Sequence, residues 1–383
     1  MRLLRLIRSL DPRLGGPTEH IRAITPLLAA QGVATTLVCF DDPAAPWLQS
    51  SSATVALGPG WGTYGYSSGV MARLMTLARS HDLLMIDGLW QFNGLAGWRV
   101  ARRLGLPHVV TVHGMLDPWF KRRYPLKHLR KQLYWGLVEA RVVSTAERVL
   151  FTTTTERDLA RDAFWPYAAR EQVVSYGSLE PPGDPQQQRE AFFEAFPQLR
   201  GRRFALFLGR IHPKKGTDLL IQAFARHARA HPDLQLVIAG PDLDGWRSEL
   251  EGLATNLGLG ERLLWTGMLS GDLKWGALHT AELFCLPSHQ ENFGIAVCEA
   301  LSCRLPVLLG HPVNIADQVH QAGAGIAHAD SVEGTAAALG QWLNADAQSR
   351  QAMALRARAL FERRFDLVQT ARELAGVLHE VRP

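Results

Sequence analysis

Short apolar runs alternate with amphipathic helical patterns from one end of the chain to the other. Runs of this length, separated by polar segments, are typical of buried strands. A regular alternation of strands and helices predicts an α/β protein built from doubly wound parallel sheets. The predicted strands lie near residues 2–7, 34–40, 54–57, 83–87, 108–112, 148–152, 171–175, 204–208, 234–239, 261–266, 283–286, 306–309 and 325–328.

One segment interrupts this alternation and predicts a domain boundary. Residues 179–188 are rich in proline and glutamine and poor in apolar residues. We therefore expect an N-terminal doubly wound domain over residues 1–180, a linker over 181–201 and a second doubly wound domain over 202–362. Residues 363–383 form a final helical segment.

The composition narrows the class of protein. The chain has 383 residues, 47% hydrophobic and 20% charged, which is typical of a soluble globular protein of two or three domains. Its net charge of +5 suits an anionic small molecule or a membrane surface and is too diffuse to indicate nucleic acid. No signal peptide or membrane span is evident, and the four cysteines lack Cys-x-x-Cys spacing, which favours a cytoplasmic protein.

The most informative segment is residues 283–303. An apolar run, 283–286, is followed by Pro287 and Ser288, a polar loop, and a helical pattern that opens at Gly294. Glu291 and Glu299 bracket this turn with seven residues between them. A helix N-terminus favours an anion, so the carboxylates are better suited to accepting hydrogen bonds from hydroxyl groups, such as those of sugars.

A second segment has the same strand–loop–helix form. The run 204–208 is followed by Gly209, Arg210 and, five residues later, Lys215 and Gly216. Glycine allows close backbone approach, and two cations beside a helix N-terminus suit a diphosphate. Alone, this segment would be interpreted as a basic surface turn; together, the two motifs favour a binding site.

The two motifs resemble the donor site of the retaining glycosyltransferases of family four (group 1). That family has the GT-B fold, in which two Rossmann-like doubly wound domains face a cleft and the last helix crosses back to the first domain. The resemblance assigns catalytic roles to His113, Glu291, Arg210 and Lys215. It assigns donor contacts to Gly15, Gly16, Gly209, Arg210, Lys215, Gly267, Met268, Glu291, Asn292, Phe293, Gly294 and Glu299.

Within that set, each element has an implied role. Arg210 and Lys215 hold the diphosphate, Glu291 lies at the sugar and Glu299 at the ribose. The strand end at 266–268 faces the base, His113 helps to position the sugar, and the loop at 15–16 faces the donor phosphate or the acceptor. Because these side chains already supply cations, the resemblance implies no metal and no cofactor besides the donor substrate.

The implied activity is transfer of a hexose from a UDP- or GDP-linked donor to a saccharide or lipid-linked acceptor, in cell-surface polysaccharide biosynthesis. The enzyme would work in the cytoplasm or at the inner face of the cell membrane. Two other interpretations stay open: a nucleotide-sugar epimerase or hydrolase of the same fold, and an inactive partner subunit.

Several segments depart from the family's pattern or allow two interpretations. Asp87 stands where a family histidine often precedes Gly-Leu-Trp, and Arg304 stands where a glycine is usual, which predicts strain if φ is positive there. Asp242 and Asp244 have metal-ligand spacing, but their position before a helix indicates a turn and a cap. Thr153 and Glu156 have the spacing of a capping box, and capping alone explains both residues.

The basic and aromatic segment 119–135 also has two interpretations. Interleaved cations and aromatic residues are typical of amphipathic segments at anionic membranes. The alternative is a solvated basic helix that packs through Leu126, Leu129, Leu133 and Trp135. A second aromatic loop, 58–69, is either a mobile acceptor loop or an ordinary surface loop.

Overall fold

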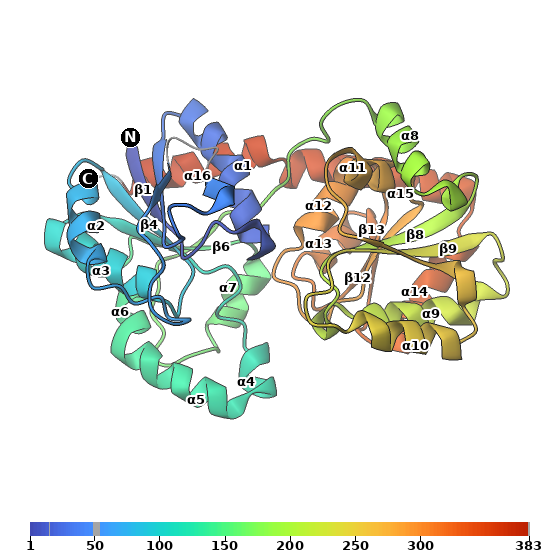
Figure 1. Ribbon diagram of the computed structural model, residues 1–383, viewed down its shortest axis with the longest axis horizontal. Helices are drawn as coiled ribbons and strands as arrows, with labels where there is room; N and C mark the ends of the chain where they lie inside the picture. The colour runs from blue at the N-terminus through green and yellow to red at the C-terminus, as the bar shows by residue number, and fades with distance from the viewer. Residues whose placement is uncertain (15, 49–53, 382–383) are drawn as a thin grey trace. The chain divides into compact units, whose positions relative to one another are not determined.

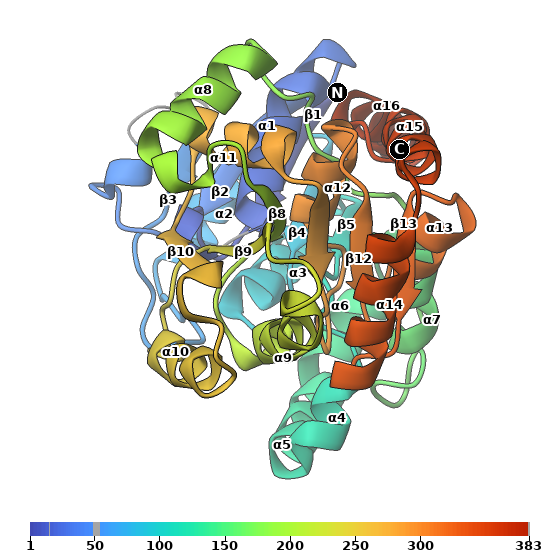
Figure 2. The ribbon, with the colours of Figure 1, turned by 90° about the vertical axis from the view of Figure 1, so that its right-hand side faces the viewer.

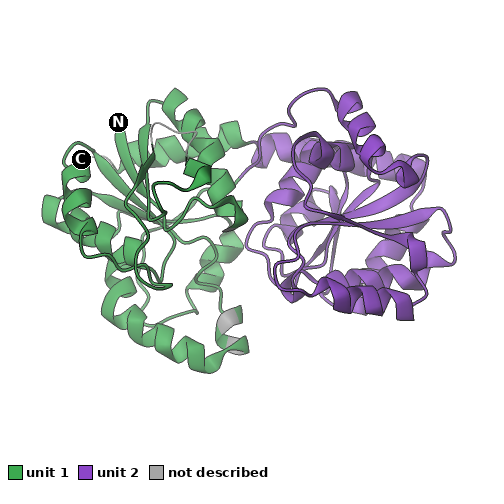
Figure 3. Ribbon diagram, in the orientation of Figure 1, with its two compact units in different colours: residues 1–176, 367–383 green, residues 177–366 purple. Residues whose placement is uncertain are grey.

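The computed structural model describes residues 1–14, 16–48 and 54–381. It divides into two compact units, residues 1–176 with 367–383 (unit 1) and residues 177–366 (unit 2), shown in Figure 3. The chain therefore passes from one unit to the other twice, at Tyr176–Gly177 and at Asp366–Leu367.

Unit 1 is built on a seven-stranded parallel sheet in the order β3-β2-β1-β4-β5-β6-β7. Helices α1 and α16 cover one face and α2 and α3 the other (Figure 1). The strands are β1 (Arg2–Leu6), β2 (Ala34–Cys39), β3 (Thr54–Ala56), β4 (Leu83–Asp87), β5 (His108–Thr111), β6 (Arg148–Phe151) and β7 (Glu171–Val173). The helices are α1 (Gly16–Ala30), α2 (Val70–Ala78), α3 (Phe92–Leu104), α4 (Trp119–Arg123), α5 (Pro125–Tyr134), a π-helical turn (Trp135–Glu139), α6 (Ala140–Ser144), α7 (Thr154–Ala160) and α16 (Leu367–Glu380).

Unit 2 is built on a six-stranded parallel sheet in the order β10-β9-β8-β11-β12-β13. Helices α9, α10 and α14 lie on one side of this sheet and α8, α11 and α12 on the other (Figure 2). The strands are β8 (Arg203–Leu208), β9 (Leu234–Ala239), β10 (Leu263–Gly267), β11 (Leu283–Leu286), β12 (Val307–Gly310) and β13 (Gly325–His328). The helices are α8 (Pro185–Ala195), α9 (Thr217–Ala228), α10 (Arg247–Asn256), α11 (Gly271–Thr280), α12 (Ile295–Ser302), α13 (Ala316–Gln321), α14 (Val332–Asn344) and α15 (Ala347–Arg364).

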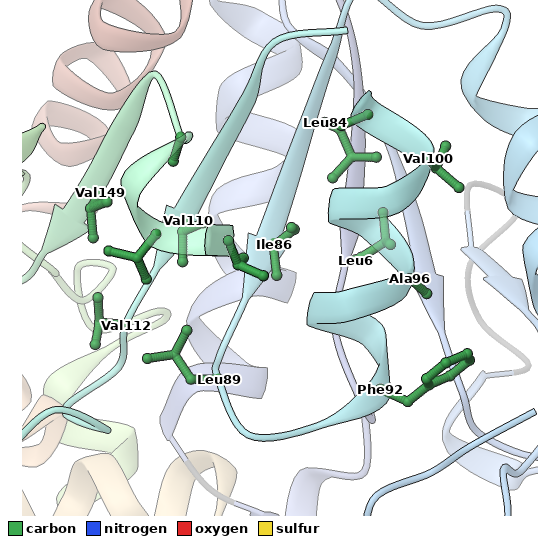
Figure 4. Close-up of a cluster of buried hydrophobic side chains, with 14 of the residues drawn as sticks. Leu6, Leu84, Ile86, Leu89, Phe92, Ala96, Val100, Val110, Val112 and Val149 are labelled. Atoms are coloured by element: carbon green, nitrogen blue, oxygen red, sulfur yellow. The ribbon is translucent and has the colours of Figure 1, made fainter. Parts of the chain in front are cut away.

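The core of unit 1 shows why the apolar runs form central strands. Side chains from β1, β4 and β5 meet α3 on one face of the sheet, where Leu6, Ile86 and Val110 are fully buried (Figure 4). A Cβ atom at Gly97 would lie 3.1 Å from both Leu6 and Ile86, so this glycine sets the distance at which α3 packs. All thirteen predicted strands are present, and every sheet pairing is parallel, as the alternation predicted.

Residues 181–201, predicted as a linker, instead contain α8 and belong to unit 2. Asp184 caps this helix by accepting hydrogen bonds from the backbone N–H groups of Gln186 and Gln187. Phe192 is fully buried, and a Cβ atom at Gly276 of α11 would lie 2.1 Å from the carbonyl oxygen of Gln188. Close packing of α8 on α11 thus makes this polar segment part of the domain.

The last helix, α16, belongs to unit 1 although the helix before it belongs to unit 2. Leu367, Leu374 and Leu378 are buried in the same cluster as Leu3 and Leu28. Among the described residues, no helix is both long enough and apolar enough to cross a membrane.

Candidate functional site in unit 2 and its counterpart in unit 1

The loops that follow β8, β9 and β10 are joined by backbone hydrogen bonds at the carboxyl edge of the unit 2 sheet. Gly209 N donates to Ala239 O at 2.9 Å, and Gly240 N donates to Gly267 O at 2.8 Å. A Cβ atom at Gly240 would lie 1.8 Å from the carbonyl oxygen of Gly209. Glycine therefore allows these loops to touch at the edge where doubly wound sheets bind ligands.

The loop after β8 places Lys215 beside the loop after β11. A 3-10 turn, Pro213–Lys215, ends at Gly216, whose φ is +67°. A Cβ atom at Gly216 would lie 2.1 Å from the carbonyl oxygen of Pro287, so no larger residue fits there without a shift. Arg210, on the same loop, is exposed to solvent.

Lys215 and Glu291 form an ion pair across these two loops. Their side chains are 19% and 18% exposed. Burial acts to raise the pKa of Glu291, but the charge and hydrogen bond of Lys215 outweigh it and hold the pKa below its ordinary value. The Glu291 backbone is held on both sides, because its N–H donates to Pro312 O at 3.1 Å and its carbonyl accepts from Asn314 N at 3.0 Å.

Glu299 is paired in the same way with a lysine that the sequence analysis missed. Lys274 Nζ of α11 lies 2.6 Å from Glu299 Oε1 of α12, and the side chains are 23% and 14% exposed. The ammonium also lies 4.5 Å from the ring centroid of Trp275. Lysine is scarce in this chain, since only six of the 41 basic residues are lysines, and this scarcity could have drawn attention to Lys274.

The other residues predicted for the donor site lie on the same edge of unit 2. Gly294 has a φ of +83° and precedes α12, so it makes the turn from loop to helix. Phe293 is buried and packs edge-to-face on Phe365, with ring centroids 5.7 Å apart. Asn292 Oδ1 accepts from Asn314 Nδ2 at 3.4 Å, and Met268, just after β10, is 70% exposed.

In unit 1, His113 lies just beyond β5 with a φ of +52°, which is uncommon for a residue other than glycine. Its Nε2 lies 2.9 Å from Asp87 Oδ1, and its Nδ1 contacts the hydroxyl of Tyr176. Because a carboxylate only accepts, Nε2 carries the proton and Nδ1 accepts from Tyr176 when the ring is neutral. Both ring nitrogens are thus engaged inside unit 1.

Asp87, whose role the sequence left open, is the acceptor that orients His113. Arg5 donates to both oxygens of this carboxylate, from Nε to Oδ2 at 2.7 Å and from Nη2 to Oδ1 at 2.9 Å. Burial acts to raise the pKa of Asp87, but the adjacent guanidinium of Arg5 outweighs it and keeps the pKa well below its usual range. The side chains of Arg5, Asp87 and His113 are 1%, 0% and 4% exposed.

Glu156 fixes the turn that carries His113. Thr153 caps α7 as predicted, accepting from Glu156 N at 2.9 Å. The Glu156 carboxylate, however, accepts from Gly114 N at 2.5 Å and from Thr152 N and Oγ1 at 2.6 and 2.7 Å. The expectation that capping alone explains this residue is therefore incomplete.

Three further predictions concern residues at the margins of these sites. Gly16 begins α1, and Gly15 lies outside the described residues. Asp242 accepts from Trp246 N and Arg247 N at 3.0 and 3.1 Å, as expected for a cap. Within the described ranges, no three His, Cys, Asp or Glu side chains are grouped so that they could hold a metal.

The predicted strain at Arg304 is present, since its φ is +61°. This residue follows α12 in the place where a family glycine is usual. Its N–H donates to Leu301 O at 3.1 Å and so closes the end of the helix.

Two doubly wound parallel-sheet units of this kind define the GT-B class. Solved structures that share the fold over 99% of the chain include Anabaena HepE in complex with UDP and glucose (TM-score 0.78, 20% identity, 100% of that chain). A second is sucrose-phosphate synthase from Thermosynechococcus elongatus (TM-score 0.79, 19% identity, 98% of that chain).

The sequence comparisons identify the family within that class. Residues 188–360 match the glycosyl transferases group 1 family, and residues 15–177 match the glycosyl transferase 4-like domain. The alpha-D-kanosaminyltransferase of Streptomyces kanamyceticus is 30% identical over 298 residues, covering 74% of this chain and 72% of that protein. The D-inositol 3-phosphate glycosyltransferase of Segniliparus rotundus is 28% identical over 335 residues, covering 80% and 72%. The chain therefore belongs to the group 1 glycosyltransferases.

Proposed function

We propose that the chain is a retaining, metal-independent hexosyltransferase that uses a UDP- or GDP-linked sugar. The observation that carries this proposal is the pair of lysine–glutamate contacts in unit 2, Lys215 with Glu291 and Lys274 with Glu299. The glycosyltransferase names of the relatives and the UDP bound to the Anabaena protein support a nucleotide-sugar donor.

The diphosphate would bind on the loop after β8. Arg210 is exposed there, and Lys215 lies just before the N-terminus of α9. As the bond to the sugar breaks, negative charge grows on the leaving phosphate, and a preplaced ammonium and guanidinium stabilise it. With these cations in place, transfer would need no divalent ion.

The two glutamates would bind different parts of the donor. Lys215 keeps Glu291 ionised and in a fixed position, so that this carboxylate can accept hydrogen bonds from sugar hydroxyls. Lys274 fixes Glu299 in the same way for the two hydroxyls of the ribose. When the diphosphate arrives, Lys215 would be shared between Glu291 and the phosphate.

His113 of unit 1 would bind a hydroxyl of the sugar. The Asp87–His113 hydrogen bond leaves Nδ1 as the acceptor, which a sugar hydroxyl would reach in exchange for the Tyr176 hydroxyl. Glu156, through Gly114, holds the turn while this exchange takes place.

The experiment incubates the protein with a panel of nucleotide sugars, with and without acceptor extract, in EDTA, and measures nucleoside diphosphate release. Release that requires the acceptor, with an α-linked product from an α-linked donor by NMR, supports the proposal. Acceptor-independent release indicates the hydrolase, and conversion of the donor to its epimer without net release, seen in the same NMR spectra, indicates the epimerase. No change in any donor indicates the inactive subunit. Activity that returns only on adding magnesium or manganese contradicts metal independence.

We also propose that the enzyme meets its acceptor at an anionic membrane surface in the cytoplasm, through the outer face of α5. This helix has no buried residue. Leu126, Leu129 and Leu133, with Leu137 one turn on, are 81%, 67%, 68% and 59% exposed. Their spacing puts them on one face. In the alternative interpretation the helix packs through Leu126, Leu129, Leu133 and Trp135, and of these four only Trp135 is buried.

The surroundings of this leucine face suit an anionic lipid surface. Lys127 and Arg130 lie on the same helix and are exposed. Trp165 is 79% exposed, and its backbone N–H donates to Gln132 Oε1 of α5 at 3.1 Å, which keeps the indole next to the helix. Leucines that enter the acyl boundary, cations at headgroup level and an interfacial tryptophan are the features of such surfaces.

Cosedimentation with vesicles of phosphatidylglycerol and phosphatidylcholine tests this contact. The double change Leu129→Ser and Leu133→Ser should reduce binding by about thirtyfold or more, since each leucine loses roughly 1 kcal/mol or more of burial. Leu355→Ser, at a leucine that is 56% exposed on α15, is the matched control and should bind as the unchanged protein does. Equal binding of both variants would contradict the proposal.

A further inference from the structure

A cavity of about 130 Å³ lies under the inner face of α5, opposite the exposed leucines. Its walls come from α4, α5, the segment after His113 and residues near 163–164. The polar lining consists of Lys121, Lys127, Lys131, His128, Tyr124 and Asp117. Among the described side chains, three lysines and a histidine therefore line one small space together with the carboxylate of Asp117.

The distribution of lysine along the chain singles out this cavity. The sequence has six lysines among 41 basic residues. Three of them line the cavity, and the other three, Lys214, Lys215 and Lys274, belong to the donor-site loops and helix of unit 2. Lysine is a compact point charge that binds phosphate well, whereas arginine supplies most of the surface ion pairs here.

The cations in the cavity act on one another. Burial lowers the pKa of Lys131 and the nearby charge of Lys127 lowers it further, while the carboxylate of Glu139 acts in the opposite direction and does not outweigh them. Burial also lowers the pKa of His128, with Lys121 and Lys131 adding to the effect. An anion placed among these groups would relieve this repulsion.

The cavity walls are ordered by aromatic contacts. His128 stacks on Phe164 with ring centroids 4.6 Å apart, and Lys131 Nζ lies 4.5 Å from the ring centroid of Trp90. Asp117 Oδ1 accepts from the backbone N–H of Trp119 at 2.8 Å, so the carboxylate shapes the turn into α4.

The cavity also lies close in sequence and space to a residue of the proposed reaction. Met115, which lines it, follows His113 by two residues, and its sulfur accepts from Leu89 N at 3.1 Å. Both segments follow strands at the carboxyl edge of the unit 1 sheet, where this kind of fold binds ligands.

We propose that this cavity binds a phosphate group carried by the acceptor. The assignment of this phosphate to an acceptor rests on the proposed function. The phosphate site itself follows from the cavity and its lysines. The phosphate belongs either to a soluble phosphorylated sugar or to a lipid headgroup, and the two sources are separated below.

The test is calorimetric titration of the full chain with inorganic phosphate. It is done in a Lys215→Ala background, so that the diphosphate loop of unit 2 does not contribute. Saturable binding is expected, and Lys127→Gln with Lys131→Gln should weaken it by about tenfold or more, since two charge-assisted contacts are lost. Lys121→Gln, at an exposed position, is a second variant that should weaken it in the same direction.

Arg103→Gln is the control, because Arg103 is exposed on α3 and lies outside the cavity lining. It removes one positive charge from unit 1 and should leave phosphate affinity within about twofold. Absence of saturable binding, or equal weakening in the control and the lysine variants, overturns the proposal.

Two further arms identify the source of the phosphate. Glucose 6-phosphate that competes with inorganic phosphate indicates a soluble acceptor, whereas competition only by phosphatidylglycerol vesicles indicates a headgroup. Neither arm uses the donor or measures turnover. A negative result in the phosphate titration therefore does not bear on transferase activity. A negative transferase assay, in turn, does not bear on the phosphate site.

Discussion

Glu139 should make the protein less stable as the pH rises from about 4.5 to 7. It is fully buried in the π-helical turn after α5, and its Oε1 accepts from Trp90 N at 2.6 Å. Its Oε2 has no hydrogen-bond partner in the described part of the chain. Burial raises the pKa of Glu139 from 4.5 to about 7, against the opposing effects of Trp90 N–H and Lys131.

The sign and size follow from proton binding. Between the two pKa values, the folded state keeps a proton that the unfolded state has lost, so the free energy of unfolding falls as the pH increases. A difference of about 2.5 pKa units corresponds to roughly 3 kcal/mol. This stabilisation is fully present below about pH 4.5 and is lost as the pH passes through 7.

Urea unfolding of the unchanged protein and of Glu139→Gln, at a series of pH values from 5 to 8, measures this loss. The glutamine side chain of the variant would still accept from Trp90 N but would not ionise. The difference in unfolding free energy between the two proteins should therefore change by about 2–3 kcal/mol over this range, in favour of the variant at high pH. Glu194→Gln, an exposed change of the same charge on α8, is the control. A difference that is constant with pH would refute the reasoning.

Three further predictions test the donor site of unit 2. Gly216→Ala and Gly258→Ala both place a side chain at a φ near +67°, which costs about 1 kcal/mol, but only the first meets an atom, Pro287 O at 2.1 Å. In urea unfolding, Gly216→Ala alone should lose a further 1–3 kcal/mol, roughly, of unfolding free energy. Equal losses in the two variants would contradict the close approach of Gly216 to Pro287 O. Lys274→Met should raise the donor KM several-fold with little change in kcat, because the freed Glu299 binds a part of the donor that does not react; a kcat effect alone would argue against this role. Asp242→Asn should retain transferase activity in EDTA, and metal-dependent activity that disappears in this variant would return Asp242 to the mechanism.

Most strands could be predicted because they contain a continuous apolar run bounded by polar residues, as β8 and β11 show. Helix α8 could not, since its residues are mostly polar and its buried side consists of Gln188 and Phe192. What orders α8 is the absence of a side chain at Gly276 of α11, and sequence periodicity does not reveal a match between segments so far apart in the chain. On α5 the periodicity predicted the leucine face correctly but gave no information on whether protein covers it.

The candidate site, like the fold, could be predicted only in part from the sequence. The loops that carry Lys215 and Glu291 were recognisable from local glycine and charge patterns, but their separation of 76 residues in the sequence hides the ion pair. Lys274 was missed because it lies mid-helix with no motif around it. The role of Asp87 became clear only when Arg5 and His113 were both found hydrogen-bonded to its carboxylate.

The central claim, that the loops of unit 2 bind the diphosphate of a nucleotide-sugar donor, is tested most directly by calorimetric titration with UDP and GDP. The unchanged protein should bind at least one of the two without added metal, and Lys215→Ala should weaken that binding by about tenfold or more. Arg226→Ala, which removes an exposed charge on α9 that is paired with Glu333, should bind as the unchanged protein does. Failure of the unchanged protein to bind either nucleotide, or equal affinities in the Lys215 and Arg226 variants, would contradict the account.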